Sequence, residues 1–316
     1  MLNLEKILKV KQEHEDKWMK YDFVHGVAIG YKRVAGQETD IVGITVFTTN
    51  KRTINEIPEE QRLPESIDGI MVDVVEEEMP NPFNDLKGED INMYRPMPGG
   101  IQISHLIRKS EKYLEIGIGT LGMFVKCKDD PSNLYILSNW HVLEKMNADI
   151  YQPNYTGDNS SKLLIAEVSK GDYYECADAG IAKVYVPSKD VQVNQILELG
   201  AIRGIYEGEP ELGQLVKKRG RTTQVTHGEI IYIYATISNG TNIYKNQVMV
   251  KGIDCDNRKI SKGGDSGSIV LTYDEEVGEN NNKVLGLLWG GNEEENIMVY
   301  SPIKYVFEEL NLEMCK

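Results

Sequence analysis

The sequence has no long apolar run. None of its segments approaches the ~18 consecutive apolar residues that a membrane-spanning helix needs. Residues 1–19 also carry charges throughout, among them Glu5, Lys6 and Lys9, so they lack the apolar core of a signal peptide. These two absences predict a cytoplasmic protein with no membrane partner.

Positive charge and cysteine are scarce as well. The 316 residues include 35 Lys and Arg against 49 Asp and Glu, a net charge of −14. Because an acidic surface repels phosphate groups, we expect no nucleic-acid partner. The four cysteines stand singly, and none has the C-x-x-C spacing of a zinc knuckle or redox pair, so we expect free thiols. The rest of the composition, 41% hydrophobic and 27% charged, is typical of a folded soluble protein.

The first 100 residues predict a small domain and then a linker. Residues 2–19 place apolar positions among charges in the manner of an amphipathic helix, and three stretches rich in Val, Ile and Thr begin at Val24, Asp40 and Asp68. We therefore predict a small α/β accessory domain over residues 1–78. Residues 79–100 contain four prolines and end in Gly99-Gly100. Since proline resists both helix and central strand, this segment is predicted to be a linker.

From residue 101 onward, short β-type runs alternate with turn signals, a pattern that favours barrels or sandwiches. Asn239-Gly240 lies between two runs rich in Tyr and Ile and predicts a hairpin. We place a first β-barrel over residues 101–190, and a second β-barrel with a C-terminal helix over residues 191–316, the helix covering Lys304–Leu312. The stretch Gly117–Gly122 matches G-x-G-x-x-G, but the residues after Gly122 resemble a hairpin and not the helix that dinucleotide binding requires.

Residues 263–268 read Gly-Gly-Asp-Ser-Gly-Ser and precede an apolar, strand-like run. A serine between glycines on a tight turn can expose its hydroxyl, and the same turn can aim successive backbone amides at one point. A nucleophilic serine also needs a base and a group that orients this base. No histidine lies after Ser266, which excludes an α/β-hydrolase, and no glycine-framed Asp precedes a suitable His, which excludes the subtilisin order. The order His, Asp, Ser remains.

His141 and Asp178 are the best partners for Ser266. His141 ends the apolar stretch that begins at Tyr135, so its ring would be held at a rigid junction between a strand and a loop. Asp178 opens another apolar stretch, where a carboxylate can be buried beside an imidazole and fix its tautomer. Each residue alone also fits a structural role. The three together, in this order within an all-β region, predict a catalytic triad.

These motifs resemble those of the trypsin-like (chymotrypsin-fold) serine peptidases, particularly bacterial members. The histidine motif is LSNWHV, the aspartate motif is DAGIAKV and the serine motif is GGDSGSIV. The stretch from Gly220, Gly-Arg-Thr-Thr, resembles a strand motif in the second barrel of bacterial secreted members, and the resemblance covers about residues 98–310. The N-terminal domain resembles that of a bacterial group similar to the plant narrow-leaf proteases, which carry an extra N-terminal domain and tend to oligomerise.

The resemblance implies a mostly β fold, a chymotrypsin-like double β-barrel with a small N-terminal α/β domain. It also implies a serine endopeptidase with a protein or peptide substrate, no metal, no cofactor and a tendency to form homo-oligomers. Ser266 would attack the peptide carbonyl, His141 would act as general base and then acid, and Asp178 would orient the imidazole.

The same resemblance implies two further sets of site residues. The amides of Gly264 and Ser266 would bind the oxyanion of the tetrahedral intermediate. The stretch LLWGG resembles the strand that pairs with the substrate main chain, so Leu288, Trp289 and Gly290 are the expected substrate-binding residues.

The sequence leaves other functions open. A binding or scaffolding protein could keep a trypsin-like fold without turnover, and a fluorophosphonate probe would separate the two because it labels only an activated serine. An esterase could use the same site, which a panel of peptides and esters would reveal. For an endopeptidase, Ile260 stands six residues before Ser266, and residues 257–263 contain Arg258 and Lys262 but no acid. Because a basic P1 side chain would lack a buried counter-charge there, we expect small or apolar residues at P1.

Asp265 is expected to be ionised and buried beneath the serine turn, where a carboxylate without a cationic partner is costly. In the bacterial peptidases that the chain resembles, a basic side chain just before the Gly-x-Thr-Thr strand fills this role. Strand alternation places Lys218 on the same face as the apolar Val216, so Lys218 is the first candidate, with Arg219 and Arg221 behind it. A solvated basic strand end is the competing interpretation.

Overall fold

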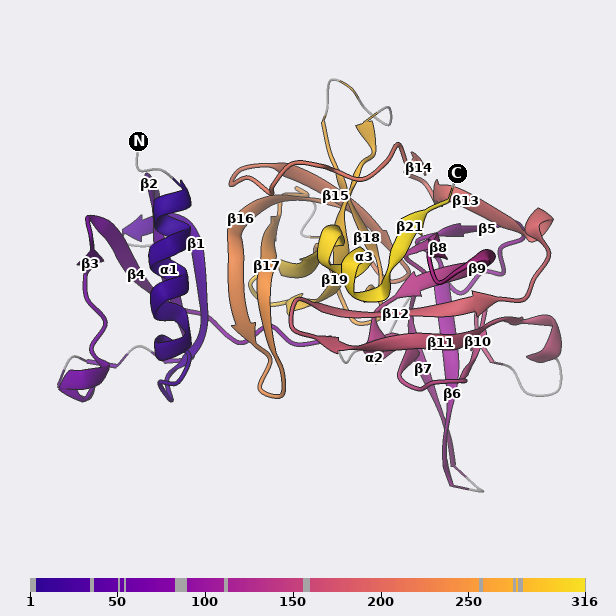
Figure 1. Ribbon diagram of the computed structural model, residues 1–316, viewed down its shortest axis with the longest axis horizontal. Coiled ribbons are helices and arrows are strands. Elements are labelled where there is room, and N and C mark those ends of the chain that lie inside the picture. Colours follow the sequence, from indigo (N-terminus) through magenta and orange to yellow (C-terminus); the bar gives the residue numbers. More distant parts are fainter. Residues whose placement is uncertain are drawn as a thin grey trace.

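Figure 1 shows the computed structural model of the chain, which describes residues 4–34, 37–50, 52–53, 55–82, 90–110, 113–155, 160–255, 258–274, 277 and 281–315. The N-terminal helix and its strands lie at one end, a barrel built from β15 to β20 lies in the middle, and strands β6 to β12 lie at the other end (Figure 1). Among the residues that the structure describes, no helix is both long and apolar enough to cross a membrane.

The N-terminal residues form the helix and strands that the sequence predicts. Helix α1 buries Ile7, Val10 and Trp18 on one face, as expected of an amphipathic helix. Strand β2 pairs with β1 in antiparallel fashion and with β4 in parallel fashion. The elements are α1 (Leu4–Trp18), β1 (Val24–Val34), β2 (Gln37–Thr48), η1 (Glu59–Gln61), β3 (Ser66–Ile67) and β4 (Ile70–Glu76).

This N-terminal unit continues the sheet of the central barrel. Strand β1 pairs antiparallel with β16 (Gln224–Ser238), with Gly26 opposite Ile237 and Gly30 opposite Tyr232. A Cβ atom on Gly30 would lie 2.3 Å from the Tyr232 ring, so glycine permits this close approach. Buried side chains of α1 and β1 also belong to the same apolar cluster as those of the barrel interior. The unit is therefore attached by a ladder and a shared core.

The central barrel is closed and six-stranded. Its strands have the order β15-β18-β19-β20-β17-β16, and β16 returns to pair with β15. The predicted hairpin joins β16 and β17, with Gly240 at a positive φ of 85° and the Asn239 side chain accepting two loop amides. The other strands are β15 (Leu215–Gly220), β17 (Ile243–Gly252), β18 (Ile269–Thr272), β19 (Val284–Asn292) and β20 (Ile297–Pro302).

The other barrel is open. Its sheet has the order β21-β8-β9-β12-β11-β10-β6-β7. The Gly117–Gly122 stretch lies at the end of β7, and the residues after it form the antiparallel pair β8 and β9, as the hairpin interpretation predicted. The strands are β6 (Gln102–Ser110), β7 (Tyr113–Thr120), β8 (Met123–Cys127), β9 (Asp130–Ser138), β10 (Asp149–Tyr151), β11 (Leu164–Tyr174), β12 (Ala177–Val184) and β21 (Leu312–Met314). The expected mostly β, chymotrypsin-like double β-barrel is confirmed.

Short elements connect the two barrels. A small sheet has the order β14-β13-β5, and the predicted C-terminal helix is α3, after which β21 crosses back to pair with β8. The four cysteines are free thiols, as the sequence predicts. The remaining short elements are β5 (Met97–Gly99), η3 (Ser188–Asp190), β13 (Val191–Ile196), β14 (Gly200–Ala201) and α3 (Ile303–Leu310), together with α2 (Trp140–Leu143) and η2 (Ser160–Lys162), which lie between strands of the open barrel.

Candidate active site

His141 and Asp178 are brought together by neighbouring strands of the open barrel. Strand β9 ends at Ser138 and pairs with β12, with Ser138 opposite Gly180. His141 lies in the short helix α2 just after β9, and Asp178 is the second residue of β12. The Asn139 side chain donates a 2.7 Å hydrogen bond to the Asp178 carbonyl. This bond fixes the strand-to-helix junction against β12.

Asp178 holds His141 at two points. Its Oδ1 accepts the backbone amide of His141 at 3.1 Å, and its Oδ2 is bonded to His141 Nδ1. The Asp178 side chain is 1% exposed, whereas that of His141 is 19% exposed. A buried carboxylate on Nδ1 leaves Nε2 as the ring nitrogen that can accept a proton. The predicted His–Asp pair is therefore present.

Ser266 lies in a glycine-rich turn that precedes β18. Gly264 and Gly267 have φ values of 94° and 93°, which favour glycine. The Gly267 amide donates to Leu288 O at 2.9 Å, and the Ser268 amide donates to Asp265 O at 3.0 Å. These two bonds tie the turn to β19 and close it upon itself.

The open barrel also contacts this turn. The Thr120 amide donates to Ser266 O at 2.9 Å, and the Thr120 hydroxyl donates to Gly264 O at 2.8 Å. A Cβ atom on Gly267 would lie 2.2 Å from Ser138 Oγ, so the two barrels meet closely at this point. The serine turn is thus held between the closed barrel, to which it belongs, and the open barrel, which carries His141 and Asp178.

The Ser266 hydroxyl donates to Trp289 O at 3.4 Å. Among the hydrogen bonds of the described residues, it makes none to His141, so the structure assembles the His–Asp pair and the serine turn without joining them. Ser266 is 3% exposed. Since side chains move between staggered rotamers, a rotation about the Ser266 Cα–Cβ bond is what would redirect the hydroxyl.

The backbone amides of Gly264 and Ser266 are available as donors. Of the turn amides, those of Asp265, Gly267 and Ser268 donate to carbonyls and that of Lys262 donates to Asp265 Oδ2. Within the described part of the chain, no hydrogen bond uses the amides of Gly264 and Ser266. Two unused amides at the serine are the donors that an oxyanion would require.

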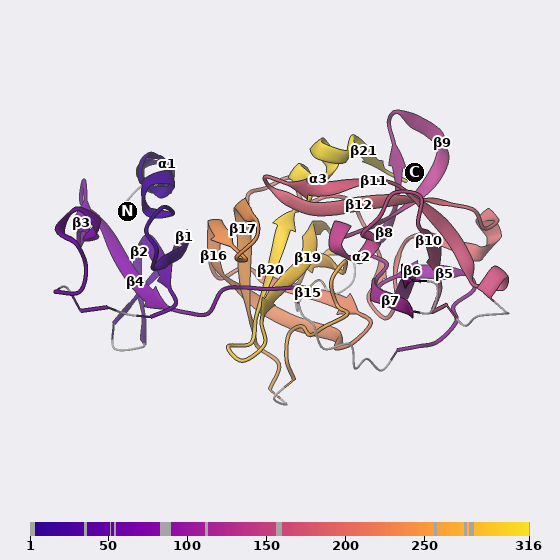
Figure 2. The same cartoon turned by 90° about the horizontal axis from the view of Figure 1, so that it is seen from below.

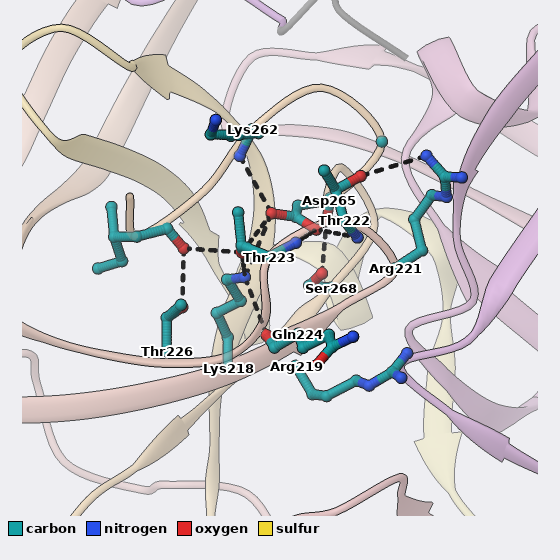
Figure 3. A network of polar contacts seen from close by, with 12 residues as sticks. Lys218, Arg219, Arg221, Thr222, Thr223, Gln224, Thr226, Lys262, Asp265 and Ser268 are labelled. Atoms are coloured by element: carbon teal, nitrogen blue, oxygen red, sulfur yellow. Dashed lines mark hydrogen bonds and ion pairs between the residues drawn. The ribbon is translucent and has the colours of Figure 1, made fainter. Parts of the chain in front are cut away.

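Asp265 lies beneath this turn and is paired with Lys218, as the sequence predicts (Figure 3). Lys218 Nζ is 3.3 Å from Asp265 Oδ2, and both side chains are fully buried. Burial lowers the pKa of Lys218, while the adjacent Asp265 charge acts in the opposite direction. Lys218 also donates to Gln224 O at 3.2 Å and to Thr223 Oγ1. All three ammonium protons therefore have acceptors.

Two threonines complete this network, and sequence reasoning did not single them out. Asp265 Oδ1 accepts the amides of Thr222 at 2.8 Å and Thr223 at 3.1 Å, and Oδ2 accepts the Thr223 hydroxyl at 2.6 Å. The signal that could have found them is the Gly-Arg-Thr-Thr motif itself. A Cβ atom on Gly220 would lie 2.4 Å from Asp265 Oδ1, so the motif's glycine makes room for the carboxylate.

The other two basic candidates have different positions. Arg219 is buried and bonded to the carboxylate of Asp90 and to the carbonyl of Gly100. Arg221 is also buried, and its Nη1 lies 3.2 Å from Thr222 Oγ1. Lys218 is therefore the basic residue of this strand that contacts Asp265 directly.

The expected substrate-binding residues lie on β19. Leu288 uses both main-chain groups to hold the serine turn, because its amide donates to Ser268 O and its carbonyl accepts from Gly267. The Trp289 ring is buried against Tyr244, and its Nε1 donates to Gln247 Oε1 at 2.8 Å. The Trp289 carbonyl faces Ser266. The carbonyl of Asn81 lies beside Gly290, 2.7 Å from where a Cβ atom would stand.

Part of this double barrel matches a known family. Residues 189–303 match the family model described as the Nal1 C-terminal domain. No curated protein matches the sequence.

The similar solved structures are trypsin- and chymotrypsin-like serine proteases. Thermobifida fusca protease A has 18% identity and a TM-score of 0.48, and the match covers 69% of this chain and 98% of that one. Cellulomonas bogoriensis chymotrypsin has 14% identity and a TM-score of 0.45, covering 69% and 97%. A glutamic acid-specific serine protease described as using a histidine triad in substrate binding has 18% identity and a TM-score of 0.48, covering 69% and 100%. The double barrel itself is defined by the pairing of its own strands.

Proposed function

We propose that the protein is a serine endopeptidase that hydrolyses peptide bonds through an acyl-enzyme. The proposal is supported by two features of the adjoining barrels: a buried carboxylate that binds His141 in the open barrel, and, where the closed barrel contacts the open one, a serine turn with two unused amides. General base, nucleophile and oxyanion donors are the three parts that acyl transfer needs.

Acylation begins when the Ser266 oxygen attacks the carbonyl carbon and its proton passes to His141 Nε2. The carbonyl oxygen becomes an oxyanion, which the amides of Gly264 and Ser266 bind. The imidazolium is stabilised by Asp178, which stays ionised. His141 then gives the proton to the leaving amine, the C–N bond breaks, and an ester on Ser266 remains.

Deacylation repeats these steps with water. His141 removes a proton from water, the hydroxide adds to the ester carbonyl, and the Ser266 oxygen leaves with the proton that His141 returns. The products are a new carboxyl group and a new amine, and the side chains regain their starting protonation. The reaction requires the Ser266 hydroxyl to leave Trp289 O for His141. Catalytic hydrogen bonds often form only when substrate is bound, so this rearrangement is compatible with the free structure.

A fluorophosphonate probe tests the proposal, since it phosphonylates only an activated serine. We expect labelling of the full-length chain at Ser266, and its loss in Ser266→Ala and His141→Ala. The matched control is His227→Ala, because His227 Nδ1 is also 3.0 Å from a carboxylate, that of Asp254, but His227 belongs to β16 and makes no hydrogen bond to the serine turn among the described residues. No labelling of the wild type would favour a binding or scaffolding protein on the same fold.

A further inference from the structure

The edge of β19 beside Ser266 carries a segment of the chain's own N-terminal region. Asn81 and Gly291 form an antiparallel bridge in which each amide donates to the other's carbonyl at 3.1 Å. Pro80 is buried, and Asn81 is exposed. Figure 2 shows the chain leaving β4 and running past β16 along the barrel toward β15 and β20.

The antiparallel register relates this bridge to the nucleophile. Trp289, whose carbonyl accepts the Ser266 hydroxyl, lies two residues before Gly291. In an antiparallel pair, the residue two positions after the one opposite Gly291 lies opposite Trp289. A peptide that pairs with this edge therefore brings that residue to the serine. Its main chain needs the same Gly291 groups that Asn81 now occupies.

The bridging segment, residues 80–82, has the features of an edge strand that can detach from β19. Main-chain groups at Pro80 and Pro82 face away from β19, because they alternate with those of Asn81. Proline has no amide to donate there, so no further strand is favoured on the outer side. The Asn81 side chain donates to Met79 O at 2.9 Å, within the segment itself. Among the described residues, the hydrogen bonds between this segment and β19 are consequently the one main-chain pair of Asn81 and Gly291.

Both sides of the segment are anchored. Before it, the Glu77 amide donates to Thr48 O at 2.9 Å. After it, the Asp90 amide donates to Arg221 O at 3.3 Å, and the Asp90 carboxylate is paired with Arg219. A tethered segment has a high effective concentration at its binding site, so a free peptide competes with it at a disadvantage.

We propose that residues 80–82 are an internal competitor, and that they must leave β19 before an extended peptide can pair there and reach Ser266. This inference rests on the proposed function, since it assigns a regulator to the same serine. It predicts that a reagent too small to reach Gly291 reacts with Ser266 regardless of the segment, whereas an extended peptide does not.

The test compares two substitutions at one position. Asn81→Pro removes the amide that donates to Gly291 O and places a ring against that carbonyl. Asn81→Ala keeps the amide and is the matched control. Each form reacts with two probes, an alkyl fluorophosphonate and an alanine tripeptide diphenyl phosphonate, and the ratio of peptide-probe to alkyl-probe labelling rates is measured. Since the net contribution of a hydrogen bond is about 1 kcal/mol, we expect this ratio to rise about five- to tenfold in Asn81→Pro and to stay constant in Asn81→Ala.

An unchanged or lower ratio in Asn81→Pro, with normal fluorophosphonate labelling, would overturn the internal competitor and leave the serine assignment intact. Absence of fluorophosphonate labelling in every form would overturn both. A second measurement needs no variant: amide hydrogen exchange of a fragment containing Asn81 should quicken when wild-type Ser266 carries the tripeptide adduct but not when it carries the alkyl adduct. Equal exchange in the two adducts would contradict displacement.

Discussion

Lys218→Met tests the support beneath the serine turn, because methionine keeps the apolar stem and removes the charge. In the variant, Asp265 would keep four hydrogen bonds, from the amides of Thr222, Thr223 and Lys262 and from the Thr223 hydroxyl, but would lose its cation. Removing one partner of a buried ion pair costs about 3–5 kcal/mol. Because the remaining donors partly compensate, we expect a loss near the lower limit, about 3 kcal/mol, in urea unfolding.

The same variant should lose activity without losing the His–Asp pair. Asp265 lies between Gly264 and Ser266, so a displaced carboxylate would disturb both of the amides that we propose as oxyanion donors. We expect the fluorophosphonate labelling rate to fall about 10²–10³-fold, the typical cost of a lost oxyanion donor. His141 and Asp178 belong to the other barrel, so the low-field proton NMR signal of the Nδ1–H bond should persist.

A double variant provides the control. Lys218→Met combined with Asp265→Asn removes both charges and should be more stable than Lys218→Met alone, because no unpaired charge stays buried. A stability of Lys218→Met within about 0.5 kcal/mol of the wild type, the usual range for surface substitutions, would refute the reasoning. A normal fluorophosphonate labelling rate in Lys218→Met would refute the proposed dependence of the Gly264 and Ser266 amides on Asp265.

Three further outcomes are expected. Burial raises the pKa of Glu77 to about 7 from its usual 4.5, so its stabilising contribution is full below pH 4.5 and is lost as the pH rises through 7. The free energy of unfolding of Glu77→Gln, measured in urea, should therefore exceed that of the wild type by at most about 3 kcal/mol at pH 8 and by much less at pH 5. An equal gain at both pH values would contradict the raised pKa of Glu77. Gly264→Ala adds a Cβ atom 2.7 Å from Thr222 Oγ1 at a φ of 94°, and should slow labelling of Ser266 about 10²–10³-fold, whereas an unchanged rate would exclude this amide as an oxyanion donor. In a P1 library, small or apolar residues should dominate, since Ile260 is an apolar core residue six positions before Ser266, and dominance of Arg and Lys would refute this.

Short-range periodicity explains why much of the fold and one part of the site were predictable. The amphipathic pattern predicted α1, and the Asn239-Gly240 dipeptide predicted the β16–β17 hairpin. The resemblance to the bacterial peptidases pointed to the basic residues just before the Gly-x-Thr-Thr strand, and strand alternation from Val216 chose Lys218 among them, because a period of two decides which side chains share a face. The His, Asp and Ser positions were inferred from their order along the chain. The structure then placed His141 against Asp178.

Contacts between distant segments were not predictable in the same way. Asn81 pairs with Gly291, and Asp90 pairs with Arg219. Both Asn81 and Asp90 belong to the proline-rich stretch, whose composition predicts only that no regular helix or strand is favoured there. The pairing of β1 with β16 was not predictable for a related reason, since the residue pattern of a strand does not specify which other strand it pairs with. The direction of the Ser266 hydroxyl depends on a single rotamer, and residue type alone does not determine it.

The most direct test of the central claim is identification of cleavage sites across a proteome treated with the wild-type protein or with Ser266→Ala. Mass spectrometry of new N-termini measures peptide-bond hydrolysis itself, without a chosen substrate. We predict a set of new N-termini that is produced by the wild type and absent with Ser266→Ala. Identical sets from the two proteins would contradict the assignment of Ser266 as the nucleophile of an endopeptidase.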